Sequence, residues 1–75
     1  MSAAPSLFET PISDRDRGFL RRLSDAIVWR EICWGEAQSA AQCMRAGFAR
    51  LSADRRFAII TSKGRDYLLQ VARVH

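Results

Sequence analysis

Four polar side chains in the middle of the chain recur at helical spacing. Gln38, Gln42 and Arg45 stand at positions i, i+4 and i+7, which brings them onto one face of a helix. In the major groove of a duplex, glutamine can bond adenine through two hydrogen bonds, and arginine can bond guanine in the same way. Ser39 adds a hydroxyl beside them. A face with these side chains is suited to contact with base edges; the alternative is an ordinary solvated helix face.

Basic side chains gather in the second half of the sequence. Residues 45–75 hold seven basic and two acidic residues, a net charge of +5, whereas residues 1–44 have a net charge of −1. All but one of the basic residues are arginine, whose guanidinium contacts phosphate through two parallel hydrogen bonds. A GC-rich genome would also explain abundant arginine, but it would not explain the clustering.

Four of these basic residues are candidates for binding a phosphate backbone. Arg55 and Arg56 fall at the expected tip of a β-hairpin, where an arginine can reach phosphate or a narrow minor groove. Arg50 before the tip and Lys63 after the hairpin extend the set. The alternative for the tip is a solubilising role or protection of a sheet edge.

The sequence lacks the residues that metal binding, cofactor binding and catalysis require. The only histidine is His75, and Cys33 and Cys43 stand ten residues apart without a CxxC pair, so we expect no metal site. The sequence has no glycine-rich phosphate loop and no nucleophile with a base, so we expect neither a cofactor nor an enzyme. Both cysteines fall in an apolar helical pattern, which favours buried thiols over a disulfide.

Length and composition restrict the architecture to one small domain. A chain of 75 residues supports a single core, and 48% hydrophobic residues are enough to build it. A pI near 10 favours polyanionic partners. The sequence shows no signal peptide and no apolar run long enough to span a membrane, so we expect a cytoplasmic location.

The first half of the chain predicts an arm and then helix. Residues 1–12 contain two prolines and read as a flexible N-terminal arm before a single domain over residues 13–75. Ser13, with acids in the following turn, predicts a helix N-terminus. That helix either continues to Cys33, or a second helix covers residues 26–33 after a cap at residues 24–25.

The second half predicts a helix, a hairpin and another helix. Gly35 precedes a helix over residues 36–46, for which we expect an apolar stripe formed by Ala37, Ala40, Ala41 and Met44. Gly47 ends it, and two strands over residues 48–52 and 56–61 follow. Thr61 or Ser62 then caps a C-terminal helix. The fold class is therefore α+β, mainly α with a small hairpin.

Large apolar residues outside this pattern predict contacts with the core or with a second copy. Trp29 and Trp34 lie in a region of near-neutral charge, which favours core packing or a dimer contact over stacking on bases. Trp34 is the better candidate for exposure because Gly35 follows it. Leu69 and Ala72 widen the apolar face of the last helix, which predicts a homodimer formed through the terminal helices.

Two segments resemble winged helix-turn-helix DNA-binding proteins of bacteria and phages. They are Met44-Arg-Ala-Gly-Phe-Ala-Arg-Leu51 and Arg56-Phe-Ala-Ile-Ile-Thr-Ser-Lys-Gly-Arg-Asp-Tyr-Leu68, about a third of the chain. In that superfamily the recognition helix often ends at an Ala-Gly pair. A two-stranded wing follows, and a Thr-x-x-Gly-Arg-x-x-Leu segment opens the next helix.

The resemblance implies a transcription regulator that binds double-stranded DNA. The helix over residues 36–46 then corresponds to the recognition helix, and Arg55 with Arg56 corresponds to the wing tip. By this correspondence we expect base contacts from Gln38, Ser39, Gln42 and Arg45. The stretch from Arg30 to Gly47 is shorter than these proteins commonly show, which leaves a second reading open. In that reading the chain is a phage-encoded inhibitor or assembly factor that binds an acidic protein surface on the same scaffold.

Overall fold

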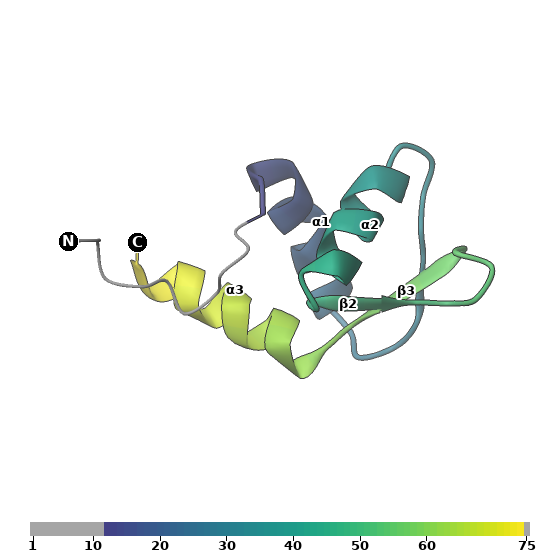
Figure 1. The fold of residues 1–75 in the computed structure, drawn as a ribbon. Helices are drawn as coiled ribbons and strands as arrows, with labels where there is room; N and C mark the ends of the chain where they lie inside the picture. Colours follow the sequence, from purple (N-terminus) through teal and green to yellow (C-terminus); the bar gives the residue numbers. More distant parts are fainter. Residues whose placement is uncertain (1–11, 75) are drawn as a thin grey trace.

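The structure, a computed structural model, describes residues 12–74, with side chains as far as Ala72. Its helices and strands, shown in Figure 1, are α1 (Asp14–Ser24), β1 (Arg30–Glu31), α2 (Ala37–Arg45), β2 (Ala49–Leu51), β3 (Phe57–Ile60) and α3 (Ser62–Val74). The expected α+β class is confirmed, with one strand more than the expected hairpin. The predicted arm, except for Ile12, lies outside the described residues; Ile12 itself is buried in the core.

Helix α1 begins where the sequence predicts. The Ser13 hydroxyl accepts a hydrogen bond of 3.2 Å from the backbone N–H of Asp16, as an N-cap does. One face of the helix then buries Phe19, Leu20 and Leu23. These side chains form the centre of the core, to which α2, the sheet, Ile12, Phe48 and Tyr67 of α3 contribute the rest.

Both predictions for the chain after α1 were wrong. The helix ends at Ser24, and residues 25–29 form turns and bends that lead into β1. There Arg30 pairs with Ala58, and the N–H of Ile32 donates to the Arg56 carbonyl at 2.8 Å. Residues 30–31 form a strand because they pair with the edge of β3. This long-range pairing outweighs the local helical periodicity.

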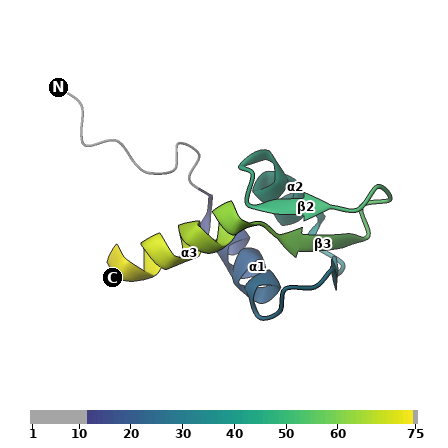
Figure 2. The same ribbon diagram turned by 90° about the horizontal axis from the view of Figure 1, so that it is seen from below.

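The three strands form an antiparallel sheet in the order β1-β3-β2. Ala49, Ala58 and Ile60 point to its inner face and are buried. Helices α1 and α2 lie together on that side of the sheet, while α3 leads away from the end of β3 (Figures 1 and 2). The inner face of the sheet thus closes the core against α1 and α2.

Helix α2 ends in a Schellman motif built on Gly47. The N–H of Gly47 donates to the Met44 carbonyl at 3.0 Å, and the N–H of Phe48 donates to the Cys43 carbonyl at 2.8 Å. Gly47 has a φ of +82°, a left-handed conformation that glycine adopts without the steric penalty of a side chain. The predicted helix end at Gly47 is confirmed, and the motif directs the chain into β2.

Thr61 connects the start of α3 to the end of α2 through hydrogen bonds. Its hydroxyl accepts from the N–H of Gly64 at 3.0 Å, so Thr61 is the cap. The same hydroxyl donates to the Gly47 carbonyl at 2.7 Å, and the Thr61 N–H donates to the Phe48 carbonyl at 2.9 Å. Phe48 also stacks on Tyr67, with ring centroids 4.4 Å apart. Helix α2, the base of the hairpin and α3 therefore meet at one joint.

Gly64 permits this joint because it has no side chain. A Cβ at this position would lie 2.3 Å from the Phe48 carbonyl oxygen and 2.9 Å from Cγ1 of Ile60. Both distances are shorter than van der Waals contact, and the first neighbour is backbone. The Thr-x-x-Gly segment is thus needed for the close packing of α3 on the hairpin.

Candidate nucleic-acid interface

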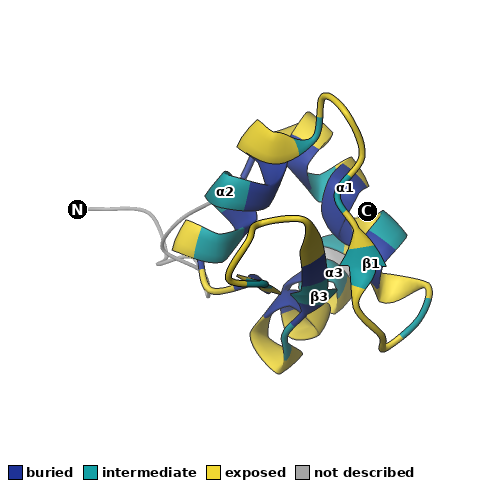
Figure 3. Cartoon of the chain, turned by 90° about the vertical axis from the view of Figure 1, so that its right-hand side faces the viewer, coloured by how far each residue is buried: buried dark blue, intermediate teal, exposed yellow. Residues whose placement is uncertain are grey.

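The buried face of α2 differs from the predicted stripe. The residues that face the core are Ser39, Ala40, Cys43 and Ala46, whereas Ala37 is exposed. By these residues, the helix is rotated by about a third of a turn from the predicted orientation. Figure 3 shows buried and exposed stretches alternating along α2. Small residues at the buried positions let α2 approach α1 closely, and this packing outweighs the simple count of apolar residues.

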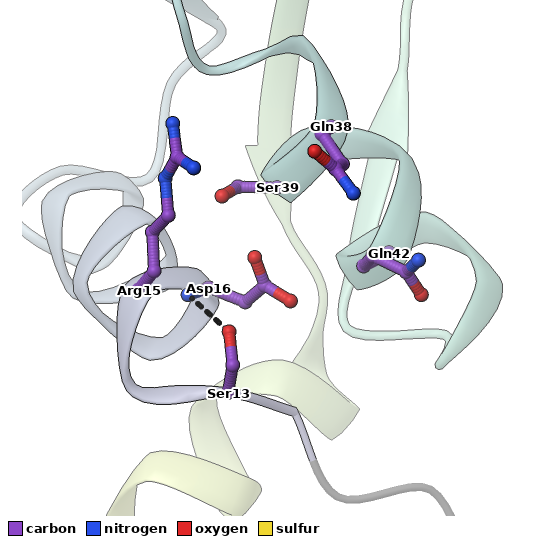
Figure 4. Close-up of a pocket in the computed structure, with 6 residues that line it drawn as sticks. All are labelled: Ser13, Arg15, Asp16, Gln38, Ser39 and Gln42. Atoms are coloured by element: carbon purple, nitrogen blue, oxygen red, sulfur yellow. Dashed lines mark hydrogen bonds between the residues drawn. The ribbon is translucent and has the colours of Figure 1, made fainter.

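This rotation keeps three of the four predicted base-contacting residues on the outside. Gln38 and Arg45 are exposed and Gln42 is half-buried, so their common face is open to a partner. Ser39 is only 3% exposed, and its hydroxyl points toward α1 in Figure 4. The prediction that Ser39 contacts a base is therefore wrong, because Ser39 lies on the face of α2 that packs against α1.

A polar pocket lies beside the outer face of α2. Gln38 and Gln42 line it together with Ser13, Arg15 and Asp16 from the start of α1 (Figure 4). The Arg15 guanidinium donates to the Gly35 carbonyl at 3.1 Å, so it is held next to the start of α2. The contribution of α1 was missed from the sequence because the packing of α1 on α2 brings these residues together from positions more than twenty apart.

Glu36 is neutralised by an ion pair within the domain. Arg22 donates to both of its carboxylate oxygens, at 3.1 and 2.5 Å, and the Cys33 N–H donates to Oε1 at 2.8 Å. Partial burial opposes ionisation, but the bonds from Arg22 and Cys33 outweigh it and lower the pKa of Glu36. The hydrogen bond to Glu36 in turn raises the pKa of Arg22. This carboxylate fixes the turn before α2 and presents no free charge to a phosphate.

The tip of the hairpin is ordered by a network around Asp54. The Ser52 hydroxyl donates to Oδ1 of Asp54 at 2.7 Å, and the Arg56 N–H donates to the same oxygen at 3.1 Å. The Phe57 N–H donates to the Ser52 hydroxyl at 3.0 Å. The bonds from Ser52 and Arg56 lower the pKa of Asp54. The one acid at the tip is thus used to shape the turn.

Arg55 lies in this turn in an unusual conformation. Its φ is +60°, the left-handed region, which costs about 1–2 kcal/mol for a residue with a Cβ. Arg55 and Arg56 are both exposed. The predicted hairpin tip is confirmed, and it projects two arginines into solvent.

The two remaining basic candidates lie apart from the tip. Arg50 is exposed in the middle of β2, opposite Ile59. Lys63 lies at the base of the hairpin, where its side chain packs next to Gly47 and its Nζ lies 5.7 Å from the centre of the Phe48 ring. Lys63 therefore lies near the end of α2, as Arg45 does, and does not belong to the hairpin tip.

The arginines of the second half are not consumed by ion pairs among the described residues. The ion pairs in residues 12–72 join Arg17 to Asp14 and Arg22 to Glu36, both in the first half of the chain. In the second half, the exposed cations among the described residues are Arg45, Arg50, Arg55, Arg56, Lys63 and Arg65. The charge excess seen in the sequence is thus available at the surface.

The cysteines are free, but only one is buried. Cys43 is in the core, where its thiol donates to the Asp16 carbonyl at 3.6 Å, and burial raises its pKa to about 12. Cys33 is exposed, which contradicts the prediction, because the segment around it is extended and not helical. Within the described part of the chain, no cluster of acids, cysteines and histidines is suited to a metal ion.

Both tryptophans are on the surface, so the prediction of core packing was wrong, whereas the expectation that Trp34 is the more exposed of the two is confirmed. Trp34 is 100% exposed in the turn before α2, and Trp29 is 48% exposed before β1. For Trp29 the difference follows from the absence of a helix over residues 26–33, because the segment leads into the edge strand β1 instead. Among residues 12–74, no helix has the length and apolar content to cross a bilayer. Comparisons with family models, curated proteins and solved structures found no match to this chain.

Proposed function

We propose that this chain is a cytoplasmic DNA-binding transcription regulator of bacterial or phage type. The outer face of α2 reads base edges with Gln38, Gln42 and Arg45, and the hairpin acts as a wing whose tip binds the backbone. This proposal takes the fold as a winged helix in which β1 replaces the second helix. It accounts for the short stretch between residues 30 and 47.

The observation that carries the proposal is the conformation of Arg55. A glycine would adopt a φ of +60° at little steric cost, and arginine adopts it only at a penalty. A strained residue at an exposed tip supports a function for its side chain. A guanidinium projecting beside Arg56, with the neighbouring Asp54 already bonded to Ser52, suits a phosphate oxygen or the minor groove.

The positive charge near the C-terminal end of α2 also supports DNA as the partner. Arg45 ends α2, and Lys63 packs beside Gly47 at the base of the hairpin. Glu36, the acid closest to the reading face in sequence, is paired with Arg22 and does not repel a phosphate. Phosphates can therefore be bound at both ends of the hairpin while the glutamines face the groove.

A homodimer is part of the proposal, because two copies double the phosphate contacts of a small domain. Leu69 on α3 is 59% exposed, and a shallow apolar hollow beside it is lined by Ser24, Arg65 and Leu68. An exposed leucine next to such a hollow suits a contact between two α3 helices.

A selection from random genomic fragments tests the function. Purified protein is mixed with the fragments and an excess of competing polyanion, and retained DNA is sequenced. We expect a recurring motif, and we expect Gln42→Ala to change the bases selected without abolishing retention. Retention of fragments without any common motif would contradict base readout.

Trp34 favours a second candidate function, the binding of an acidic protein. Its side chain is fully exposed beside a depression lined by Arg15, Phe19 and Glu36, and tryptophan with arginine is typical of interface hot spots. In this alternative, no duplex is retained selectively. Trp34→Ala would then abolish binding to the protein partner and leave any nonselective DNA binding unchanged.

A further inference from the structure

The outer face of the sheet is left open by the fold. Side chains alternate along β3, so Ala58 and Ile60 point inward while Phe57 and Ile59 point outward. By their register, Glu31 and Arg50 lie on the same outer side, opposite Phe57 and Ile59. Figure 2 looks onto this side and shows no helix across β2 and β3 within the described residues.

Trp29 continues this face at the edge of the sheet. It stands two residues before Glu31, so strand alternation places it on the same side. Extending the pairing of Arg30 with Ala58 by one residue brings Trp29 opposite Ile59. Phe57 is then the diagonal neighbour of Trp29, and aromatic side chains are large enough to reach each other across this separation. Trp29 is 48% exposed and Phe57 is 38% exposed, which leaves both rings accessible to a partner.

Arginines border these rings. The Arg56 guanidinium lies 6.0 Å from the centre of the Phe57 ring, and Arg50 lies across β3 and Ile59 from Trp29. Among the described residues that the pairing places on this face, Glu31 is the acid, and Arg50 and Arg56 outnumber it. Two aromatic rings on a sheet, with arginines at their side, offer flat surfaces for stacking and charges for phosphates.

We propose that this sheet face binds single-stranded nucleic acid by stacking bases on Trp29 and Phe57, with phosphates held by Arg50 and Arg56. A duplex hides the faces of its bases and cannot stack there. A second copy of the chain would bring the same arginines against each other. The proposal goes beyond the regulator function, because it needs neither α2 nor a base sequence, and it remains testable if duplex recognition fails.

Titration of tryptophan fluorescence with a 15-nucleotide oligo(dT) tests the proposal. Trp34→Phe serves as the background, so that Trp29 alone reports. We expect the oligonucleotide to quench this emission, and Trp29→Ala or Phe57→Ala to weaken binding, measured by anisotropy, about 5- to 150-fold, the loss for one stacked base. Trp29→Phe should restore most of the affinity. Both side chains are exposed, so circular dichroism should show an unchanged fold.

Two further probes separate stacking from charge. An oligomer of the same length with abasic sugars keeps the phosphates and removes the bases, and its affinity should not depend on Trp29. A polyglutamate peptide offers charge to the same arginines. Binding of oligo(dT) that is unaffected by Trp29→Ala would overturn the proposal. Polyglutamate binding as tight as oligo(dT) binding and equally dependent on Trp29 would do the same, in favour of an acidic protein.

Discussion

The hydroxyl of Thr61 donates a 2.7 Å hydrogen bond to the carbonyl of Gly47, fourteen residues earlier in the chain. The same oxygen accepts from the N–H of Gly64 and caps α3. One side chain therefore satisfies a free carbonyl at the end of α2 and a free amide at the start of α3. Through this bond, the base of the hairpin is fixed relative to the helix that carries Gln38, Gln42 and Arg45.

Removing the Thr61 hydroxyl should destabilise the domain. Thr61→Val keeps the shape of the side chain but leaves the Gly47 carbonyl and the Gly64 amide without this partner. We expect the free energy of unfolding, measured by urea denaturation, to fall by about 1–2 kcal/mol. Thr61→Ser, which keeps the hydroxyl, should lose much less. Equal losses for both variants would show that the hydroxyl does not act as described.

Two glycines in helices should respond in opposite directions to alanine. Gly64→Ala places a Cβ against the Phe48 carbonyl oxygen, which is backbone and cannot yield without moving β2. We expect a loss of about 3 kcal/mol or more. Gly18 lies in α1, and beyond its chain neighbours and the helix backbone no described atom lies within 4 Å of an added Cβ, so Gly18→Ala should stabilise the domain by about 0.5–1 kcal/mol. Thermal unfolding of both variants checks this; a well-folded Gly64→Ala protein would contradict the packing.

The parts of the fold that were predictable are those determined locally. Ser13 as a helix cap, Gly47 as a helix end and the turn around Asp54 each depend on neighbours within a few residues. The sequence signals for these features are correspondingly direct. The Thr61 cap was predictable for the same reason, although its second bond to Gly47 was not.

The parts that were missed depend on tertiary contacts. Residues 26–33 carry a helical pattern, but the unpaired edge of β3 offers hydrogen bonds that only the folded hairpin provides. The position of Trp29 on the sheet follows from that pairing. The rotation of α2, which buries Ser39, follows from its packing against α1. Neither effect is visible in the periodicity of the segment itself.

Arg55 should oppose stability while it supports binding. Arg55→Gly relieves the left-handed strain, offset in part by the greater freedom of glycine in the unfolded chain, so we expect a gain of about 0.5–1 kcal/mol. Arg55→Ala keeps a Cβ at the same φ and should leave the stability within about 0.5 kcal/mol of the original. Both variants lose the charge and should bind duplex DNA equally weakly. Thermal denaturation and anisotropy titration measure the two effects, and a destabilised Arg55→Gly would contradict the strain.

Asp54 should titrate below its ordinary range. Its ionised form accepts from Ser52 and Arg56, so the pKa is lowered in the folded state. The contribution of these bonds to stability is therefore present above the unfolded pKa and is lost as the pH falls through the folded one. An NMR titration that follows the Arg56 amide should report the lowered pKa, and Ser52→Ala should move it back up. An ordinary pKa in the unaltered protein would rule out the network.

The salt dependence of duplex binding tests the central claim most directly. Affinity for a labelled duplex is measured by anisotropy over a range of salt concentrations, for the unaltered protein and for Arg55→Ala/Arg56→Ala. We predict a steep fall of log affinity with log salt, and a slope shallower by about 2 in the double variant, because two phosphate contacts are lost. Identical slopes for the two proteins, or no duplex binding at low salt, would contradict the account.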